Sequence, residues 1–93
     1  MKLEIKQNIL IEHLNYVIRG ISNKNIIPVL NCIKFDLTND GLYLMSTDNE
    51  IAIQTFIPSS QIENIDKCGT VVVSGRYIYE IVRKLPNELI TIE

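Results

Sequence analysis

Long apolar runs are missing from this sequence. Its uninterrupted apolar stretches are only a few residues long, whereas a helix that crosses a bilayer needs about 20. Residues 1–6 alternate apolar and charged side chains and lack the apolar stretch of a secretory signal peptide. We therefore expect a cytoplasmic protein with no membrane partner.

Cysteine and histidine are scarce, which leaves little material for metal or nucleophile chemistry. Cys32 and Cys68 are isolated thiols without metal-ligand spacing. We interpret them as small buried or half-buried residues of a reducing compartment, with a disulfide or a zinc site as the less favoured alternatives. His13 is the only histidine and has no nucleophile at helical spacing, which favours a structural role. We expect no metal, no cofactor and no catalytic residues.

Motifs for phosphate binding and acid–base chemistry are weak. The sequence has no glycine-rich phosphate loop, and its nearest equivalent is Ser74-Gly75-Arg76, a strand-to-helix junction that by itself indicates only a helix cap. Asp48 and Glu50 lie two residues apart in an extended segment, which makes a poor acid–base pair. We expect Asp48 to bond the backbone of a turn.

The net charge of −2 excludes a chain that is basic as a whole, but the charges are unevenly placed. The two segments with helical patterns, 8–24 and 74–85, hold five basic and two acidic residues, and the remainder holds four basic and nine acidic residues. Such a bipolar domain can present one face to a polyanion.

The first half of the chain predicts a strand, a helix and three further strands. Residues 2–7 alternate as in a half-buried strand, and Asn8 is a plausible N-cap for the helix that follows. The helix carries an apolar stripe of Leu10, Leu14, Val17, Ile18 and Ile21. A strand is expected over 26–37, with Pro28 near its start. Asn39-Asp40-Gly41 predicts a hairpin turn between this strand and the strands 42–46 and 51–57.

The second half begins the same pattern and stops within it. Residues 59–69 are interpreted as a polar connection, with a short turn around Ile62 and Ile65 as an option, and Val71-Val72-Val73 as the next strand. Ser74 is expected to cap a helix whose apolar stripe is Ile78, Ile81, Val82 and Leu85, and which ends at Leu85-Pro86 before a strand over 89–92. The order predicts a βαβββ unit and an incomplete repeat of it, with an unpaired sheet edge. We expect an α+β domain, incomplete over residues 1–93, with both helices on one face of a mostly antiparallel sheet.

Basic side chains gather on the exposed sides of the two predicted helices. Arg76 and Arg83 share one side about two helical turns apart, and Arg19 and Lys24 lie at the end of the first helix. From the pattern alone, a solvated helix face and an anion-binding face remain equal alternatives.

Three short motifs, in order and in register, resemble the N-terminal domain of the bacterial DNA polymerase III β subunit, the sliding clamp. They are Ile27-Pro28-Val29-Leu30, then Ser46-Thr47-Asp48-Asn49-Glu50 after the Asp-Gly hairpin, then Val73-Ser74-Gly75-Arg76 leading to Ile81-Val82-Arg83-Lys84-Leu85-Pro86. The resemblance covers the whole chain. Two departures are that residues 22–25 lack the usual glycine or threonine pattern and that Lys24 replaces the commoner arginine, losing the bidentate fork.

The resemblance implies a DNA-clamp fold and a non-enzymatic replication processivity factor. Two chains of three domains form a ring around double-stranded DNA, with helices lining the hole, and the ring tethers DNA polymerase without reading sequence. Lys24, Arg76 and Arg83 match DNA-facing basic positions, and Arg19 completes the set that we expect to bind DNA. The pocket for polymerase and clamp loader lies in later domains. Two alternatives remain, a small α+β protein–protein adaptor and a non-catalytic subdomain of an enzyme.

Overall fold

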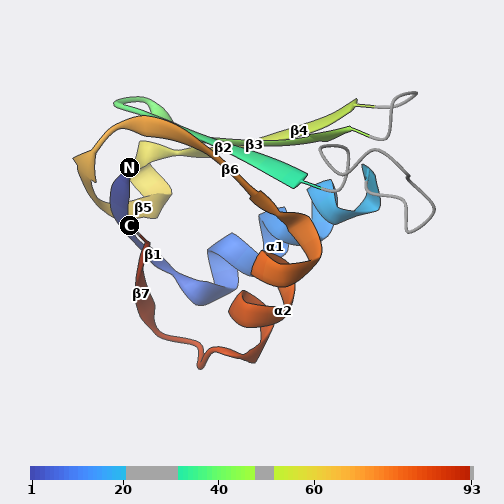
Figure 1. Ribbon diagram of the computed structural model, residues 1–93. Coiled ribbons are helices and arrows are strands. Elements are labelled where there is room, and N and C mark those ends of the chain that lie inside the picture. The colour runs from blue at the N-terminus through green and yellow to red at the C-terminus, as the bar shows by residue number, and fades with distance from the viewer. Residues whose placement is uncertain (21–31, 48–51, 93) are drawn as a thin grey trace.

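The computed structural model describes residues 1–20, 32–47 and 52–92. Helix and strand bounds within these residues follow the chain in the order shown in Figure 1. The elements are β1 (Lys2–Lys6), α1 (Gln7–Val17), the 3-10 helix η1 (Ile18–Gly20), β2 (Cys32–Thr38), β3 (Gly41–Thr47), β4 (Ala52–Pro58), the 3-10 helix η3 (Ser59–Gln61), β5 (Ile62–Lys67), β6 (Gly69–Ser74), α2 (Gly75–Lys84) and β7 (Leu89–Ile92). The described helices are too short or too polar to cross a membrane.

The strands form two antiparallel sheets. One has the order β4-β3-β2-β6 and the other the order β5-β1-β7. Both helices lie beneath the four-stranded sheet in Figure 1. This confirms the predicted α+β class and the placement of the helices on one face. The division into two sheets was not predicted, because it depends on β1 pairing with two strands that lie far along the chain.

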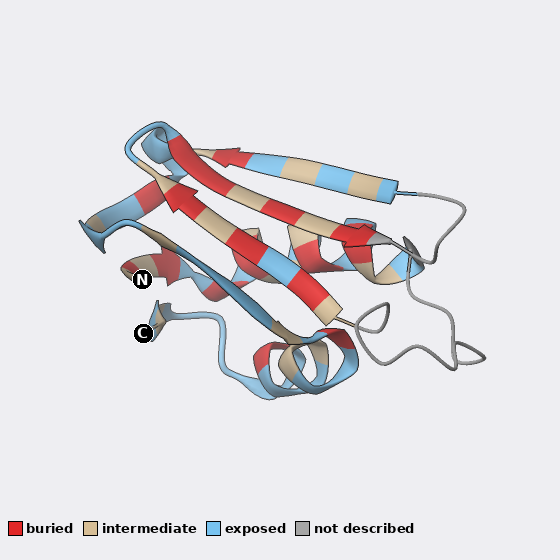
Figure 2. Ribbon diagram, turned by 45° about the horizontal axis from the view of Figure 1, so that its top comes forward, coloured by how far each residue is buried: buried red, intermediate tan, exposed pale blue. Residues whose placement is uncertain are grey.

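The hydrophobic core lies between the helices and the four-stranded sheet. Buried and more exposed residues alternate along β2 and β3, as Figure 2 shows. The inward side chains pack with those of α1 in one hydrophobic core. The residues of this core on β2, β3 and α1 are fully or almost fully buried: Ile33, Phe35, Leu37, Leu42, Leu44, Leu10, Leu14 and Val17. The predicted stripe of the first helix is therefore confirmed through Val17. Ile18 is half-buried, and Ile21 lies outside the described residues.

The β2–β3 hairpin is confirmed at the predicted Asn39-Asp40-Gly41 turn, with Thr38 opposite Gly41. The Thr38 hydroxyl accepts from the Asp40 N–H and donates to the Gly41 carbonyl oxygen, both at 3.2 Å. Gly41 has a φ of 150°, which side chains rarely tolerate. A Cβ here would also collide with the Ile57 carbonyl oxygen on β4. The turn therefore requires glycine.

The prediction that residues 59–69 form a polar connection, with at most a short turn around Ile62 and Ile65, was wrong, because they contain β5. Ile62 pairs with Ile5 and Ile65 pairs with Leu3. The step from Ile62 to Ile65 covers three positions on β5, whereas the step between their partners covers only two on β1. Irregularities in the strand register accommodate the extra residue. The two isoleucines face the core at a spacing that lacks the period of two by which a half-buried strand is recognised.

The helix starts also differ in detail from the predictions. Helix α1 begins at Gln7 with Lys6 as its N-cap, so Asn8 is not the cap. The Gln7 backbone N–H instead donates to the Glu88 carbonyl oxygen at 2.9 Å, a tertiary contact that replaces a local cap. Ser74 is the N-cap residue of α2 as predicted, but its side chain makes no capping bond in the described structure.

The apolar stripe of α2 is only partly buried. Val82 is 2% exposed and Ile78 is half-buried, whereas Ile81 and Leu85 are 40% and 38% exposed. The helix ends at Lys84, at the predicted Leu85-Pro86 boundary. Strand β7 covers 89–92 as predicted and forms an edge of the three-stranded sheet within the described residues. That further strands follow it stays a prediction.

Candidate nucleic-acid interface

The two helices pack side by side in opposite directions. Gln7, at the start of α1, donates from Nε2 to the carbonyl oxygen of Val82 near the end of α2, at 2.9 Å. Farther along, the Tyr79 hydroxyl donates to Asn15 Oδ1 at 2.7 Å. One contact is buried and the other is exposed, so the pair is joined on both its inner and its outer side. The end of α1 therefore lies near the start of α2.

This packing decides where three of the predicted DNA-binding residues lie. Arg19 follows Asn15 by one helical turn, and Arg76 precedes Tyr79 by almost one turn, so both lie toward the same end of the pair. Arg83 lies one turn beyond Tyr79, toward the other end. All three side chains belong to exposed residues. We call Arg19, Arg76 and Arg83 the basic strip. The fourth predicted residue, Lys24, lies outside the described residues.

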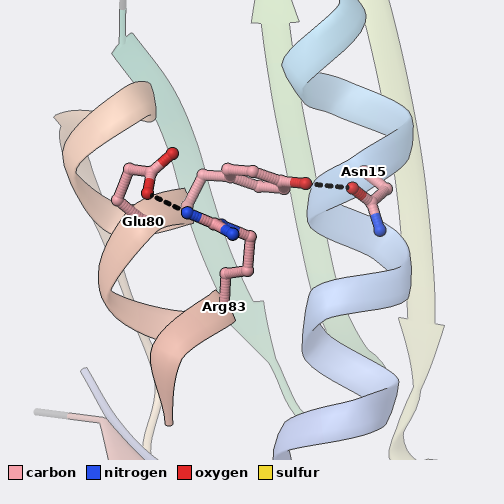
Figure 3. A network of polar contacts seen from close by, with 4 residues as sticks. Asn15, Glu80 and Arg83 are labelled. Atoms are coloured by element: carbon pink, nitrogen blue, oxygen red, sulfur yellow. Dashed lines mark hydrogen bonds and ion pairs between the residues drawn. The ribbon is translucent and has the colours of Figure 1, made fainter.

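Arg83 is bound by an acid of its own helix. Its Nη2 donates to Glu80 Oε2 at 2.6 Å, and the two side chains are 51% and 49% exposed. Figure 3 shows this pair on α2, with Asn15 on the neighbouring helix. The spacing of three residues places the two side chains as neighbours on the helix surface. The sequence analysis named the arginines but missed this ion pair, although the spacing of three residues between Glu80 and Arg83 is a usable signal.

Both members of this pair remain charged at neutral pH. The hydrogen bond from Arg83 is the main cause that lowers the pKa of Glu80, and the charges of Arg83, Lys84 and Arg76 lower it further. The same hydrogen bond raises the pKa of Arg83. All three cations of α2 thus favour the ionised form of the Glu80 carboxylate. Arg83 therefore stays ionised while Glu80 holds it.

His13 has a structural contact, as predicted. Its Nδ1 lies 2.7 Å from the Thr55 hydroxyl on β4, and its ring meets that of Tyr16 edge-on, with centroids 5.6 Å apart. Burial lowers the pKa of His13, and the nearby charge of Glu12 opposes this weakly. The imidazole therefore joins α1 to the sheet.

The cysteines are thiols as expected, with one correction. Cys32 is half-buried, but Cys68 is exposed rather than buried or half-buried. Cys68 lies beside the β2–β3 turn, where its Sγ donates to Asn39 Oδ1 at 3.4 Å. Within the described ranges, histidine, cysteine and acidic residues form no group of three that could hold a metal. Asp48 and Glu50 are outside those ranges.

The outward face of the four-stranded sheet carries a shallow hollow of about 250 Å³. It is lined by Lys34, Asp36, Tyr43, Met45 and Gln54. The four on β2 and β3 alternate with the buried residues of those strands, and Gln54 lies on β4, so the hollow faces away from the helices and the basic strip. The rings of Tyr43 and Phe56 pack beside it with centroids 4.6 Å apart.

Comparison with known proteins gives one family. Residues 1–93 match the family described as DNA polymerase III beta subunit, N-terminal domain. The chain is 34% identical over 97 residues to the beta sliding clamp of Bacillus subtilis, covering 100% of this chain and 26% of that protein. It is 35% identical over 92 residues to the beta sliding clamp of Staphylococcus aureus, with coverages of 95% and 24%. The chain thus spans about a quarter of the length of these relatives.

The fold is similar to that of a solved clamp. The beta subunit from the DNA polymerase of Streptococcus pyogenes superposes with a TM-score of 0.93 at 29% identity, covering 100% of this chain and 24% of that one. The two sheets and the paired helices therefore form one domain of a known architecture.

Proposed function

The chain belongs to the DNA polymerase III beta subunit family, the beta sliding clamps, and we propose on this premise that it is the N-terminal domain of a ring that encircles double-stranded DNA. The ring is a processivity factor that tethers a replicative DNA polymerase. It is an accessory, non-catalytic subunit. Its hold on DNA is topological, since closure prevents escape while weak contacts allow movement.

The observation that carries the proposal is the basic strip on the exposed side of the helix pair. The inner sides of the helices bury Leu10, Leu14 and Val82 in the core, so the sides with Arg19, Arg76 and Arg83 are left for a partner. Arginine and lysine neutralise phosphates, and phosphate contacts position a protein on a duplex without reading its sequence. Lys24 belongs to this surface in the proposal.

The remaining partners follow from the same proposal. Later domains bind the polymerase and the clamp loader, two complete chains associate into the ring, and the protein works in the cytoplasm. The alternative of a protein–protein adaptor would present the basic strip to an acidic partner in place of DNA, so binding of duplex DNA by the helix face is the observation that separates the two functions.

Substitutions in the proposed full-length clamp test the DNA role. Lys24→Ala combined with Arg83→Ala is expected to weaken binding to a short fluorescent duplex. It should also flatten the dependence of log affinity on log salt by about one unit for each phosphate that the protein no longer neutralises. Lys67→Ala, which removes an exposed cation from β5, is the matched control and should change little. Equal reductions in affinity in both variants, or reductions for some DNA sequences only, would contradict the proposal.

A further inference from the structure

Glu80 occupies a place that a DNA-binding surface has reason to avoid. It lies on α2 between Arg76 and Arg83, one helical turn from each. Phosphates repel a carboxylate, so an acid at the centre of a cationic surface weakens the attraction of that surface for DNA. Its position therefore calls for a functional explanation.

The geometry shows what the carboxylate does there. Glu80 Oε2 holds Arg83 Nη2 at 2.6 Å, just shorter than the range of about 2.7–2.9 Å that is usual for a charge-assisted N–H···O hydrogen bond. A guanidinium has a fixed fork of N–H donors, and the donor bound to Glu80 cannot bind a phosphate at the same time. A phosphate that approaches Arg83 has to displace Glu80 or share the guanidinium with it.

Stability alone does not explain the pair. Both side chains are about half exposed, and exposed ion pairs contribute little to folding because water and salt screen them. Arg76 provides a contrast on the same helix, since it forms no ion pair within the described residues. One arginine of the strip is thus held by an acid and another is not.

We propose that Glu80 limits how tightly the basic strip holds DNA, by keeping Arg83 engaged within the protein so that its phosphate contact stays weak and exchangeable. The inference rests on the proposed function, because it assumes that Arg83 meets DNA. It adds a residue that tunes the contact. A clamp has to move along the duplex, and a guanidinium that returns to Glu80 after each contact favours movement over a fixed grip.

The test uses the proposed full-length clamp with four substitutions: Glu80→Gln, Glu63→Gln, Arg83→Ala and the double variant Glu80→Gln/Arg83→Ala. Glu63 is the matched control, because it is also half exposed, at 50%, and also paired with a cation, Lys6, at 3.9 Å on the three-stranded sheet. Affinity for a short fluorescent duplex is measured by anisotropy across a range of salt concentrations.

Glu80→Gln is expected to tighten binding by about two- to fivefold at low salt, the size expected when an exposed ion pair no longer competes. It should also steepen the salt dependence by up to about one unit, because Arg83 becomes available to phosphate. Glu63→Gln is expected to give a clearly smaller change. In the double variant, the gain from Glu80→Gln should be clearly smaller than in the single variant, because only the relief of repulsion between the carboxylate and phosphates remains.

The outcomes distinguish the proposed role of Glu80 from the proposed contact of Arg83 with DNA. If Arg83→Ala weakens binding but Glu80→Gln does not tighten it, the role of Glu80 is wrong and the DNA role of Arg83 stands. If Glu80→Gln tightens binding equally with and without Arg83, Glu80 does not act through Arg83, and the inference also fails. If Arg83→Ala has no effect on binding, the proposed contact of Arg83 with DNA fails and the inference falls with it.

Discussion

Gln7 and Val82 lie 75 residues apart in sequence, and the Gln7 side chain donates to the Val82 carbonyl oxygen at 2.9 Å. The Gln7 backbone N–H also donates to the Glu88 carbonyl oxygen. One residue at the start of α1 therefore holds both the end of α2 and the segment that leads to β7. Gln7 is only 8% exposed, so these bonds are shielded from competition with water. They fix the helix pair that carries the basic strip.

Gln7→Met keeps the length of the side chain and removes the donor. The Val82 carbonyl oxygen keeps the Leu85 N–H as a partner, so it is not left wholly unsatisfied. We expect a decrease of about 1 kcal/mol in the free energy of unfolding, the usual net value of one hydrogen bond. Urea unfolding measures it. Asn8→Ala is the matched control at the exposed neighbouring position, and an equal decrease there would show that the buried bond has no special role.

Gly41→Ala tests the hairpin turn. Alanine would have to adopt a φ of 150°, and its Cβ would collide with the Ile57 carbonyl oxygen. The turn or β4 therefore has to shift. We expect a decrease in stability of about 1–3 kcal/mol, the range for a strained backbone position. At Gly69 a Cβ would lie 3.4 Å from the nearest atom, the Met1 nitrogen, and Gly69→Ala should change thermal stability little. Similar midpoints for the two variants would contradict this account of the turn.

The lowered pKa of His13 predicts that the free energy of unfolding decreases on mild acidification. Burial lowers its pKa in the folded protein below the ordinary value of 6.5, so the unfolded chain binds more protons in this range. The contribution of His13 to the free energy of unfolding is therefore fully present above about pH 6.5. It is lost as the pH drops toward the lower pKa of the folded state. His13→Gln should flatten the stability profile in this window, above the range where carboxylates titrate. An unchanged profile in the variant would assign the pH dependence to other groups.

The sequence predicted the elements whose signals are local. The hairpin at Asp40-Gly41, the alternation in β2 and the end of α2 before Pro86 all depend on residues within a few positions of one another, and all are confirmed. Strand β5 was missed because its two core residues, Ile62 and Ile65, are three apart and fit β1 only through irregular register. The start of α1 was misplaced because its backbone donor is satisfied by Glu88. Such a tertiary bond leaves no local trace.

The candidate site was predicted in its composition but not in its internal bonding. Basic residues opposite an apolar stripe identified Arg19, Arg76 and Arg83 as exposed, and they are exposed. The bond between Tyr79 and Asn15, which joins the two helices, depends on how the helices pack and could not be read from either helix alone. The role of these arginines in binding DNA stays a prediction.

Retention on circular DNA tests the central claim most directly. The proposed full-length clamp is placed on a nicked circular duplex by its clamp loader, and its dissociation is followed before and after a restriction enzyme makes the circle linear. Encirclement predicts slow dissociation from the circle and rapid dissociation from the linear ends, with weak salt dependence on the intact circle because closure, not phosphate contact, retains the ring. Equal dissociation from circular and linear DNA would contradict the account.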